Sequence, residues 1–147
     1  MEFRDLKAQY QRYKTEIDNA IQEVLQDASF ISGKQVAELE GLLAEYVGVK
    51  HCITCANGTD AMTLMMKAWG IKKGDAVFVP DFTFFASGEV VSYEGATPVF
   101  VDVDRDTFNI DTVKLEKSIQ KTIEEGKYSP KAIIAVDLFG LPANYPE

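Results

Sequence analysis

The feature that most restricts the fold of this 147-residue chain is an alternation of strand-like and helix-like segments after residue 50. Short apolar runs predict strands at residues 51–56, 76–79, 97–103 and 131–136. Segments with helical periodicity lie between them, at residues 59–69 and 83–94 and after Asp111. This alternation is typical of α/β proteins, in which a parallel-type sheet carries helices on both faces. We therefore expect that fold class.

Two amphipathic helices are predicted ahead of the sheet. The first covers residues 5–27, and the second begins at a capping-box pattern from Ser32 to Gln35 and ends at Gly48. The second helix is expected to bury its apolar side chains, which are Val36, Leu39, Leu42, Leu43 and Tyr46. We expect one partial domain over residues 1–147, with N-terminal helices in 1–48 and a β/α region in 49–147. Its last loop looks cut before the next helix, which predicts truncation at the C-terminus.

The charge balance argues against nucleic acid as a partner. The net charge is −8, the isoelectric point is near 4.7, and no basic cluster stands out. No signal-peptide pattern and no run of about 20 apolar residues is present, so a membrane partner is not expected either. Two cysteines suit a reducing compartment, and the expected location is the cytoplasm.

The segment HCITCANGTDA at residues 51–61 is the strongest candidate site. It predicts a buried strand, a turn and a helix start, and a helix start can hold a phosphate through unpaired N–H groups and the helix dipole. Gly58 is expected to take a positive φ, Thr59 to cap the helix, and Asp60 to lie in its first turn. The segment lacks the lysine of a nucleotide P-loop and the glycine spacing of a dinucleotide site, which disfavours those ligands. The alternative is a simple strand-to-helix turn.

Three phenylalanines follow the second predicted strand, namely Phe82, Phe84 and Phe85. Ligands of parallel sheets bind outside the carboxyl ends of the strands, so one of these rings is placed to stack on a planar ligand. Packing under the edge of the sheet is the alternative.

Two further patterns are interpreted as structural. Cys52 and Cys55 lie along a predicted strand, which favours two small core residues over a redox pair or a zinc site. Asp102, Asp104 and Asp106 lack the glycine and closing glutamate of a calcium loop, so a polar turn is expected. No metal site and no catalytic residue is predicted.

Taken together, the segments resemble the N-terminal part of the DegT/StrS-type sugar aminotransferases. The resemblance covers essentially the whole chain, in order, through FRDLKAQYQRYKTEIDNAIQEVL, FISGKQVAELEGLLAEYVG, CANGTDAM, VFVPDFTFFAS, GATPVFVDVDRDTFNID and KAIIAVDLFGLPAN. It implies the large domain of the aspartate-aminotransferase fold and pyridoxal 5'-phosphate (PLP) as cofactor. Gly58, Thr59 and Asp60 match the residues that bind the cofactor phosphate, and Phe84 matches the aromatic that stacks on its ring.

The resemblance also implies a substrate class and a missing part. The expected reaction is amination of a nucleotide-linked keto-sugar, commonly with glutamate as donor, in surface-polysaccharide or amino-sugar biosynthesis, by a homodimer. The family's catalytic lysine and the acid that pairs with the pyridine nitrogen both lie after the loop matched by residues 138–144, so this chain alone is expected to be inactive. The alternatives are a non-catalytic α/β module that binds a phosphate ligand and a half-domain that pairs with another chain.

Overall fold

The computed structural model describes residues 4–146 and divides the chain into two compact units, Met1–Thr54 and Cys55–Glu147. The division predicted between residues 48 and 49 remains a prediction. Across the described residues, no helix has the length and apolar character needed to cross a membrane.

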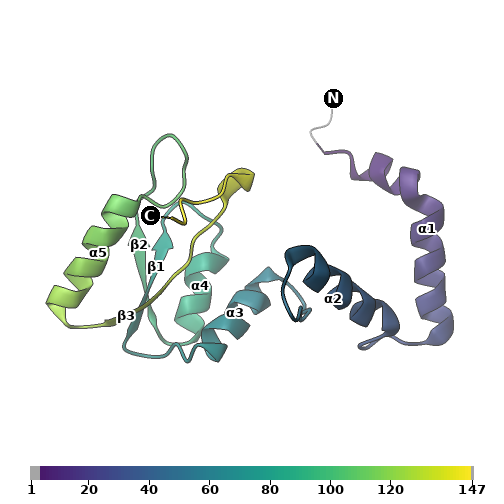
Figure 1. Cartoon of the computed structure of the whole chain (residues 1–147), viewed down its shortest axis with the longest axis horizontal. Helices are drawn as coiled ribbons and strands as arrows, with labels where there is room; N and C mark the ends of the chain where they lie inside the picture. Colours follow the sequence, from purple (N-terminus) through teal and green to yellow (C-terminus); the bar gives the residue numbers. More distant parts are fainter. Residues whose placement is uncertain (1–3, 147) are drawn as a thin grey trace. The chain divides into compact units, whose positions relative to one another are not determined.

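The first unit holds two helices, α1 (Leu6–Asp27) and α2 (Lys34–Val47), close to the predicted spans (Figure 1). The Asp5 carboxylate accepts a hydrogen bond from the N–H of Ala8 at 2.8 Å and caps α1. Gly48 ends α2 as predicted, with a φ of 77° that a glycine adopts without strain. Helix α1 contains no buried residue.

Two expectations for α2 are wrong. The residue that caps the helix is Gly33, without a side-chain hydrogen bond, and the predicted capping box of Ser32 and Gln35 does not form. Ser32 adopts a left-handed φ of 49° in the preceding loop, which places it outside the cap. Only Ala44 is buried among the residues of α2, because no layer covers its apolar face within this unit. The exposed side chains are Val36, Leu39, Leu42, Leu43 and Tyr46.

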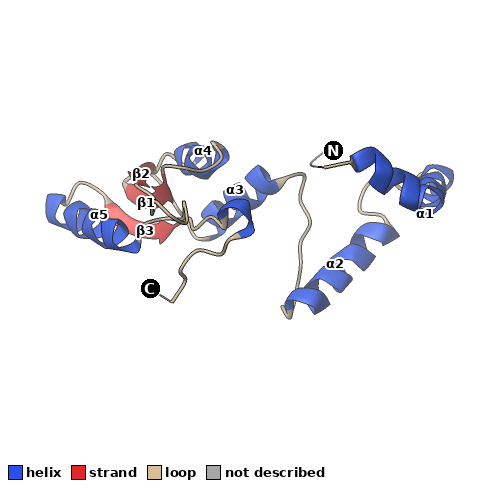
Figure 2. Cartoon of the chain, turned by 90° about the horizontal axis from the view of Figure 1, so that it is seen from above, coloured by secondary structure: helices blue, strands red, loops and turns tan. Residues whose placement is uncertain are grey.

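The second unit is an α/β structure with a three-stranded parallel sheet (Figures 1 and 2). Its elements in chain order are α3 (Gly58–Ala68), β1 (Asp75–Pro80), α4 (Ala86–Tyr93), β2 (Thr97–Val101), α5 (Thr112–Glu125), β3 (Ser129–Ile133) and the short 3-10 helix η1 (Leu138–Gly140). The strand order is β2-β1-β3, so β1 lies in the centre. The expected parallel sheet is confirmed.

The core lies on both faces of β1, whose six residues are all buried. On one face, Val77 and Val79 pack with residues of α3 and α4, including Met66 and Val90. On the other face, Phe78 packs with Val101 and Ile110, and partly buried Leu115 and Ile119 of α5 complete that cluster. Because alternate side chains of a strand point to opposite faces, β1 joins the two clusters. Helices on both faces of the sheet are therefore confirmed.

The strand expected at residues 51–56 does not form. Ile53 is 82% exposed, and the segment pairs with no strand among residues 4–146. A strand needs a ladder partner for its backbone groups, and both sides of β1 are already taken by β2 and β3. Thr54 instead donates from its N–H and its hydroxyl to one carboxylate oxygen of Glu40, at 2.8 and 2.9 Å.

Two apolar segments of the second unit are only partly covered. The strand expected at 131–136 starts earlier, at Ser129, and it lies at the edge of the sheet with Ile133 47% exposed. In α3 the buried side chain is Met66, whereas Leu64, Met65 and Trp69 are exposed. An apolar pattern identifies a face of a segment without showing which neighbours cover it.

Candidate functional site

The N-terminus of α3 is organised by Asn57. Its side-chain oxygen accepts from the N–H of Asp60 at 2.9 Å, and its amide nitrogen donates to the Asp60 carboxylate at 3.1 Å. Asn57 therefore caps the helix, and the prediction that Thr59 does so is wrong. Gly58 is the first helical residue and does not take the predicted positive φ.

This helix start has donors and space for a phosphate. The first intrahelical bond runs from the N–H of Ala61 to the carbonyl of Asn57, at 3.1 Å. The N–H groups of Gly58 and Thr59 precede that bond and have no partner within the described part of the chain. A Cβ built on Gly58 would meet no heavy atom within 4 Å, so a ligand can approach the backbone there. These residues fit an anionic group.

Asp60 is placed differently from Gly58 and Thr59. Its N–H and its carboxylate are both engaged by Asn57. Asp60 therefore stabilises the helix start, and its direct contact with a phosphate remains a prediction.

The aromatic residues after β1 are exposed. Phe84 is 78% exposed and Phe85 is 77% exposed, so these two rings do not pack under the edge of the sheet. Phe82 instead lies 5.5 Å from Phe108, measured between ring centroids. The hydroxyl groups of Thr83 and Ser87 are 2.9 Å apart and hold the backbone on either side of Phe84. Phe84 thus presents a ring at the carboxyl end of β1 that could stack on a planar ligand.

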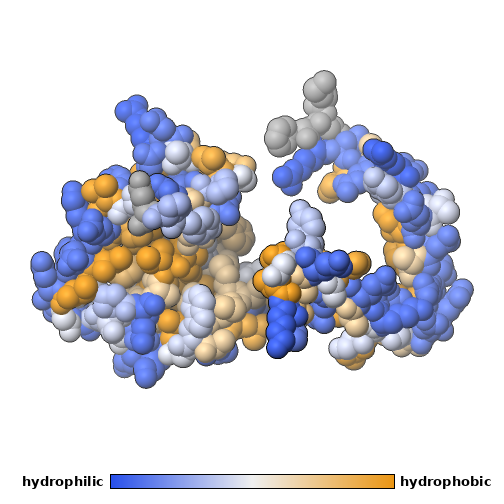
Figure 3. Space-filling model, viewed as in Figure 1, coloured by the Kyte–Doolittle hydropathy of each residue, from blue (hydrophilic) through white to orange (hydrophobic). Residues whose placement is uncertain are grey.

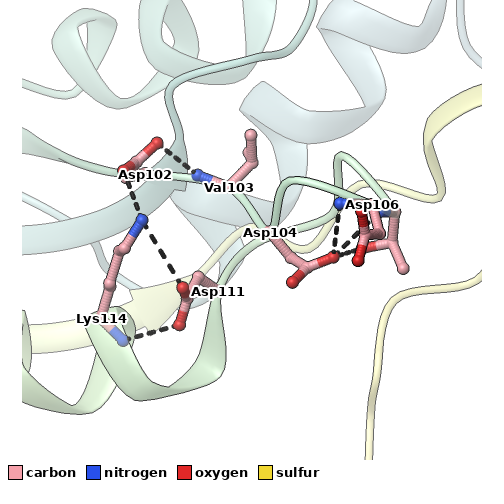
Figure 4. A network of polar contacts seen from close by, with 7 residues as sticks. Asp102, Val103, Asp104, Asp106, Asp111 and Lys114 are labelled. Carbon is pink, nitrogen blue, oxygen red and sulfur yellow. Dashed lines mark hydrogen bonds and ion pairs between the residues drawn. The ribbon is translucent and has the colours of Figure 1, made fainter.

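Asp104 organises a polar turn after β2, as predicted (Figure 4). One oxygen of its carboxylate accepts from the N–H groups of Asp106 and Thr107, at 3.0 and 2.9 Å, and from the Thr107 hydroxyl at 3.0 Å. These hydrogen bonds, chiefly those from Thr107, lower the pKa of Asp104. No group of three or more His, Cys, Asp or Glu side chains suited to a metal occurs among residues 4–146.

Lys114 links this turn to α5. Its ammonium group donates to Asp102 and lies 3.6 Å from the carboxylate of Asp111, the residue that caps α5 (Figure 4). The hydrogen bond lowers the pKa of Asp102 and raises that of Lys114. Because both side chains are exposed, we assign this pair a structural role at the surface.

The two cysteines are not core residues, contrary to the prediction. Cys55 is exposed and its thiol donates to the carbonyl of Asn57 at 3.3 Å, while Cys52 is half-buried. With no strand at residues 51–56, they lack the sheet that would have buried them.

Sequence reasoning missed Asn109. The Asn109 side chain donates to the carbonyls of Leu141 and Pro142, at 3.1 and 3.0 Å. Asp137 accepts from the N–H of Ala143, at 3.0 Å, and the residue is exposed. An amide between apolar Phe108 and Ile110 was the available signal, since a buried amide requires hydrogen-bond partners.

Comparison with known proteins decides the family. The model of the DegT/DnrJ/EryC1/StrS aminotransferase family matches residues 11–147. The chain belongs to this family. The UDP-2-acetamido-2-deoxy-3-oxo-D-glucuronate aminotransferase of Pseudomonas aeruginosa is 46% identical over 145 residues, which are 99% of this chain and 38% of that protein.

Solved structures of DegT/DnrJ/EryC1/StrS aminotransferases agree with the fold. One from Brucella abortus superimposes with a TM-score of 0.96 at 52% identity, covering 99% of this chain and 39% of that one. A putative sugar aminotransferase of Streptococcus pneumoniae in its PLP form gives a TM-score of 0.75 at 32% identity, covering 86% and 31%.

These comparisons confirm the fold class, the family and its cofactor. The family consists of PLP-dependent aminotransferases, and the chain spans about 38% of the length of the P. aeruginosa relative. The roles of Gly58, Thr59, Asp60 and Phe84 toward the cofactor remain predictions.

Proposed function

We propose that the protein containing this chain transfers an amino group to the keto carbon of a nucleotide-linked sugar. The observation that carries the proposal is the start of α3, where two backbone N–H groups and open space beside Gly58 meet the needs of a phosphate in a chain of this family. Glutamate is the proposed amino donor.

The residues of this chain hold and orient the cofactor in this proposal. Gly58 and Thr59 bind its phosphate through backbone N–H groups, Asn57 and Asp60 fix the helix start that presents them, and Phe84 stacks on the ring. Bound PLP supplies the electron sink that amino transfer requires. Phosphate and ring are thus held by two helix starts, those of α3 and α4, which belong to the same unit.

The substrate class follows from the relatives. The P. aeruginosa relative is named for a UDP-linked 3-oxo-glucuronate, and a relative from Acidithiobacillus ferrooxidans, 45% identical over 142 residues, for a UDP-linked 3-dehydro-glucosamine. Both names describe a ketone on a UDP-linked sugar. We therefore place this protein in amino-sugar or surface-polysaccharide biosynthesis and propose a homodimer, which the exposed apolar side chains of α1 and α2 support.

The test uses the full-length protein with PLP, glutamate and UDP-linked 3-keto-sugars. We expect a visible cofactor band on PLP addition and an aminated sugar nucleotide, detected by mass spectrometry. Residues 1–147 expressed alone are the comparison sample and are expected to give no aminated product. A full-length protein that binds no PLP would overturn the proposal, as would PLP binding without amination of any nucleotide keto-sugar.

A further inference from the structure

The loop after β3 has a fixed and strained conformation. Phe139 lies at φ 54° and ψ 20°, and Gly140 follows at φ 84°. A left-handed backbone is unfavourable for a residue with a Cβ, and such residues persist where surrounding contacts enforce them. The Phe139 side chain is nevertheless 85% exposed, so its own packing does not repay the strain.

Asn109 holds the residues after Phe139 and Gly140 from outside the loop. Asn109 is 6% exposed, and both N–H bonds of its side-chain amide are used on the carbonyls of Leu141 and Pro142. Its own backbone is fixed in the hairpin after β2, where the carbonyl of Asn109 accepts from the N–H of Asp104 at 2.8 Å. Its side-chain oxygen is buried without a partner among the described residues, so the two donated bonds are what hold this amide in place.

Asp137 closes the loop from within. One oxygen of its carboxylate accepts from the N–H of Ala143 at 3.0 Å and from the hydroxyl of Tyr145 at 2.9 Å. Residues 137–145 therefore form a loop whose two ends are joined through the Asp137 side chain. Asn109 holds the second half of this loop. Phe139 lies in the part of the loop that forms no hydrogen bond with the side chains of Asp137 and Asn109.

The loop and the hairpin lie at the same edge of the sheet as Phe84. The hairpin follows β2, the loop follows β3 and Phe84 follows β1, and the three strands are parallel. Figure 1 shows the hairpin and the loop beyond the same end of the sheet. The strand β1, which leads to Phe84, lies between β2 and β3. The hydrogen bonds from Asn109 to the loop therefore connect the segments that follow the two outer strands. Ligands of parallel sheets bind at this edge.

We propose that residues 137–145 form a preformed wall of the substrate pocket, in which Phe139 contacts the sugar nucleotide and Asn109 is the positioning residue. The proposal rests on the proposed function and deepens it. An exposed aromatic ring suits the flat face of a base or a sugar ring. Asn109 acts before binding by holding the loop, so that little ordering remains to oppose substrate binding.

The test compares Phe139→Ala and Asn109→Ala in the full-length protein. Phe139→Ala is expected to raise the KM for the sugar nucleotide about tenfold, equivalent to about 1.4 kcal/mol, with kcat and PLP affinity within about twofold of wild type. Asn109→Ala is expected to raise the same KM and also to speed hydrogen exchange of the N–H groups of residues 138–145. Tyr93→Ala is the control, because Tyr93 is an exposed aromatic residue at the C-terminal end of α4, whereas Phe84 lies just before the N-terminal end of that helix.

Each outcome decides a separate point. An unchanged KM in Phe139→Ala, or an equal rise in Tyr93→Ala, would overturn the substrate contact. Unchanged hydrogen exchange at residues 138–145 in Asn109→Ala would overturn the positioning role, and that measurement does not depend on activity. Wild-type protein that aminates no sugar nucleotide would instead overturn the proposed function and the substrate contact with it.

Discussion

At the scale of single residues, Gly58 is not required by the fold of α3 but has a proposed role in binding the cofactor phosphate. It is the first residue of α3, it does not need a positive φ, and a Cβ there would meet no atom within 4 Å. The helix therefore tolerates alanine at this point. The space that a methyl group would fill is the space that a phosphate would use to reach the backbone N–H groups.

We expect Gly58→Ala to weaken PLP binding at least about tenfold while the melting temperature stays the same or rises slightly, because alanine is the better helix former. Spectral titration with PLP and thermal unfolding measure the two effects. Gly41→Ala is the matched control, since Gly41 lies in α2 and also has open space around it. Unchanged PLP affinity in Gly58→Ala would show that the phosphate does not lie against this residue.

At the scale of elements, α5 shows how much a single cap contributes. Asp111 ends the hairpin after β2, and its carboxylate accepts from the N–H of Lys114 at 3.0 Å. Leu115 and Ile119 of the same helix pack against Phe78 of β1. A frayed start of α5 would therefore loosen one face of the core.

Asp111→Ala is expected to lower the free energy of unfolding by about 1 kcal/mol, since the first turn of α5 loses its cap. The shift of the urea midpoint at constant m-value measures it. Asp106→Ala is the control, because Asp106 lies in the same hairpin and contributes only its backbone N–H to the turn. Equal losses from both substitutions would point to a general effect of removing negative charge rather than to the cap.

The same elements show what the sequence can and cannot specify. Asp111 and Gly48 were correctly placed at helix ends because a cap depends on a few neighbouring residues. The segment at 51–56 was misassigned because an apolar run indicates a strand only if another strand lies beside it, which is information from outside the segment. The start of α3 was located correctly, although its cap is Asn57 rather than Thr59.

The hydrogen bonds from Asn109 to the loop after β3 could not be predicted from the sequence, for a related reason. These hydrogen bonds join Asn109 to Leu141 and Pro142, which lie 32 and 33 positions further along the chain. Nothing in the local pattern around Asn109 or Leu141 specifies that pairing. Local chemistry therefore located the helix start that we propose as the phosphate site, whereas long-range contacts fix the loop that we propose as a wall of the pocket.

At the scale of the whole molecule, the exposed apolar surface is the main feature. Apolar side chains gather beside α5 and over the sheet in Figure 3, where a cavity of about 830 Å³ is lined by Ile110, Val113, Leu115, Ile119 and Ile133 among others. Helix α1 exposes a further apolar stripe made of Tyr10, Tyr13, Ile17, Ile21 and Leu25. Most of the stability of a protein helix comes from packing of such a face, so an uncovered α1 would be marginal in water.

We expect the full-length protein to sediment as a homodimer and the double substitution Ile17→Glu and Ile21→Glu to shift it toward monomer, because two charges would then lie on the stripe of α1. Sedimentation velocity over a range of protein concentrations measures the shift. The double substitution Gln11→Glu and Gln22→Glu adds the same charge on another face of α1 and should leave the dimer intact.

The outcome of that comparison distinguishes two uses of the stripe. If the Ile17 and Ile21 substitutions dissociate the dimer without lowering the melting temperature of the monomer, the stripe meets a second copy. If they lower the melting temperature and leave the dimer in place, the stripe packs within its own chain and the dimer must use another surface. Helix α1 needs a covering layer in either case, because none of its residues is buried in the unit that contains it.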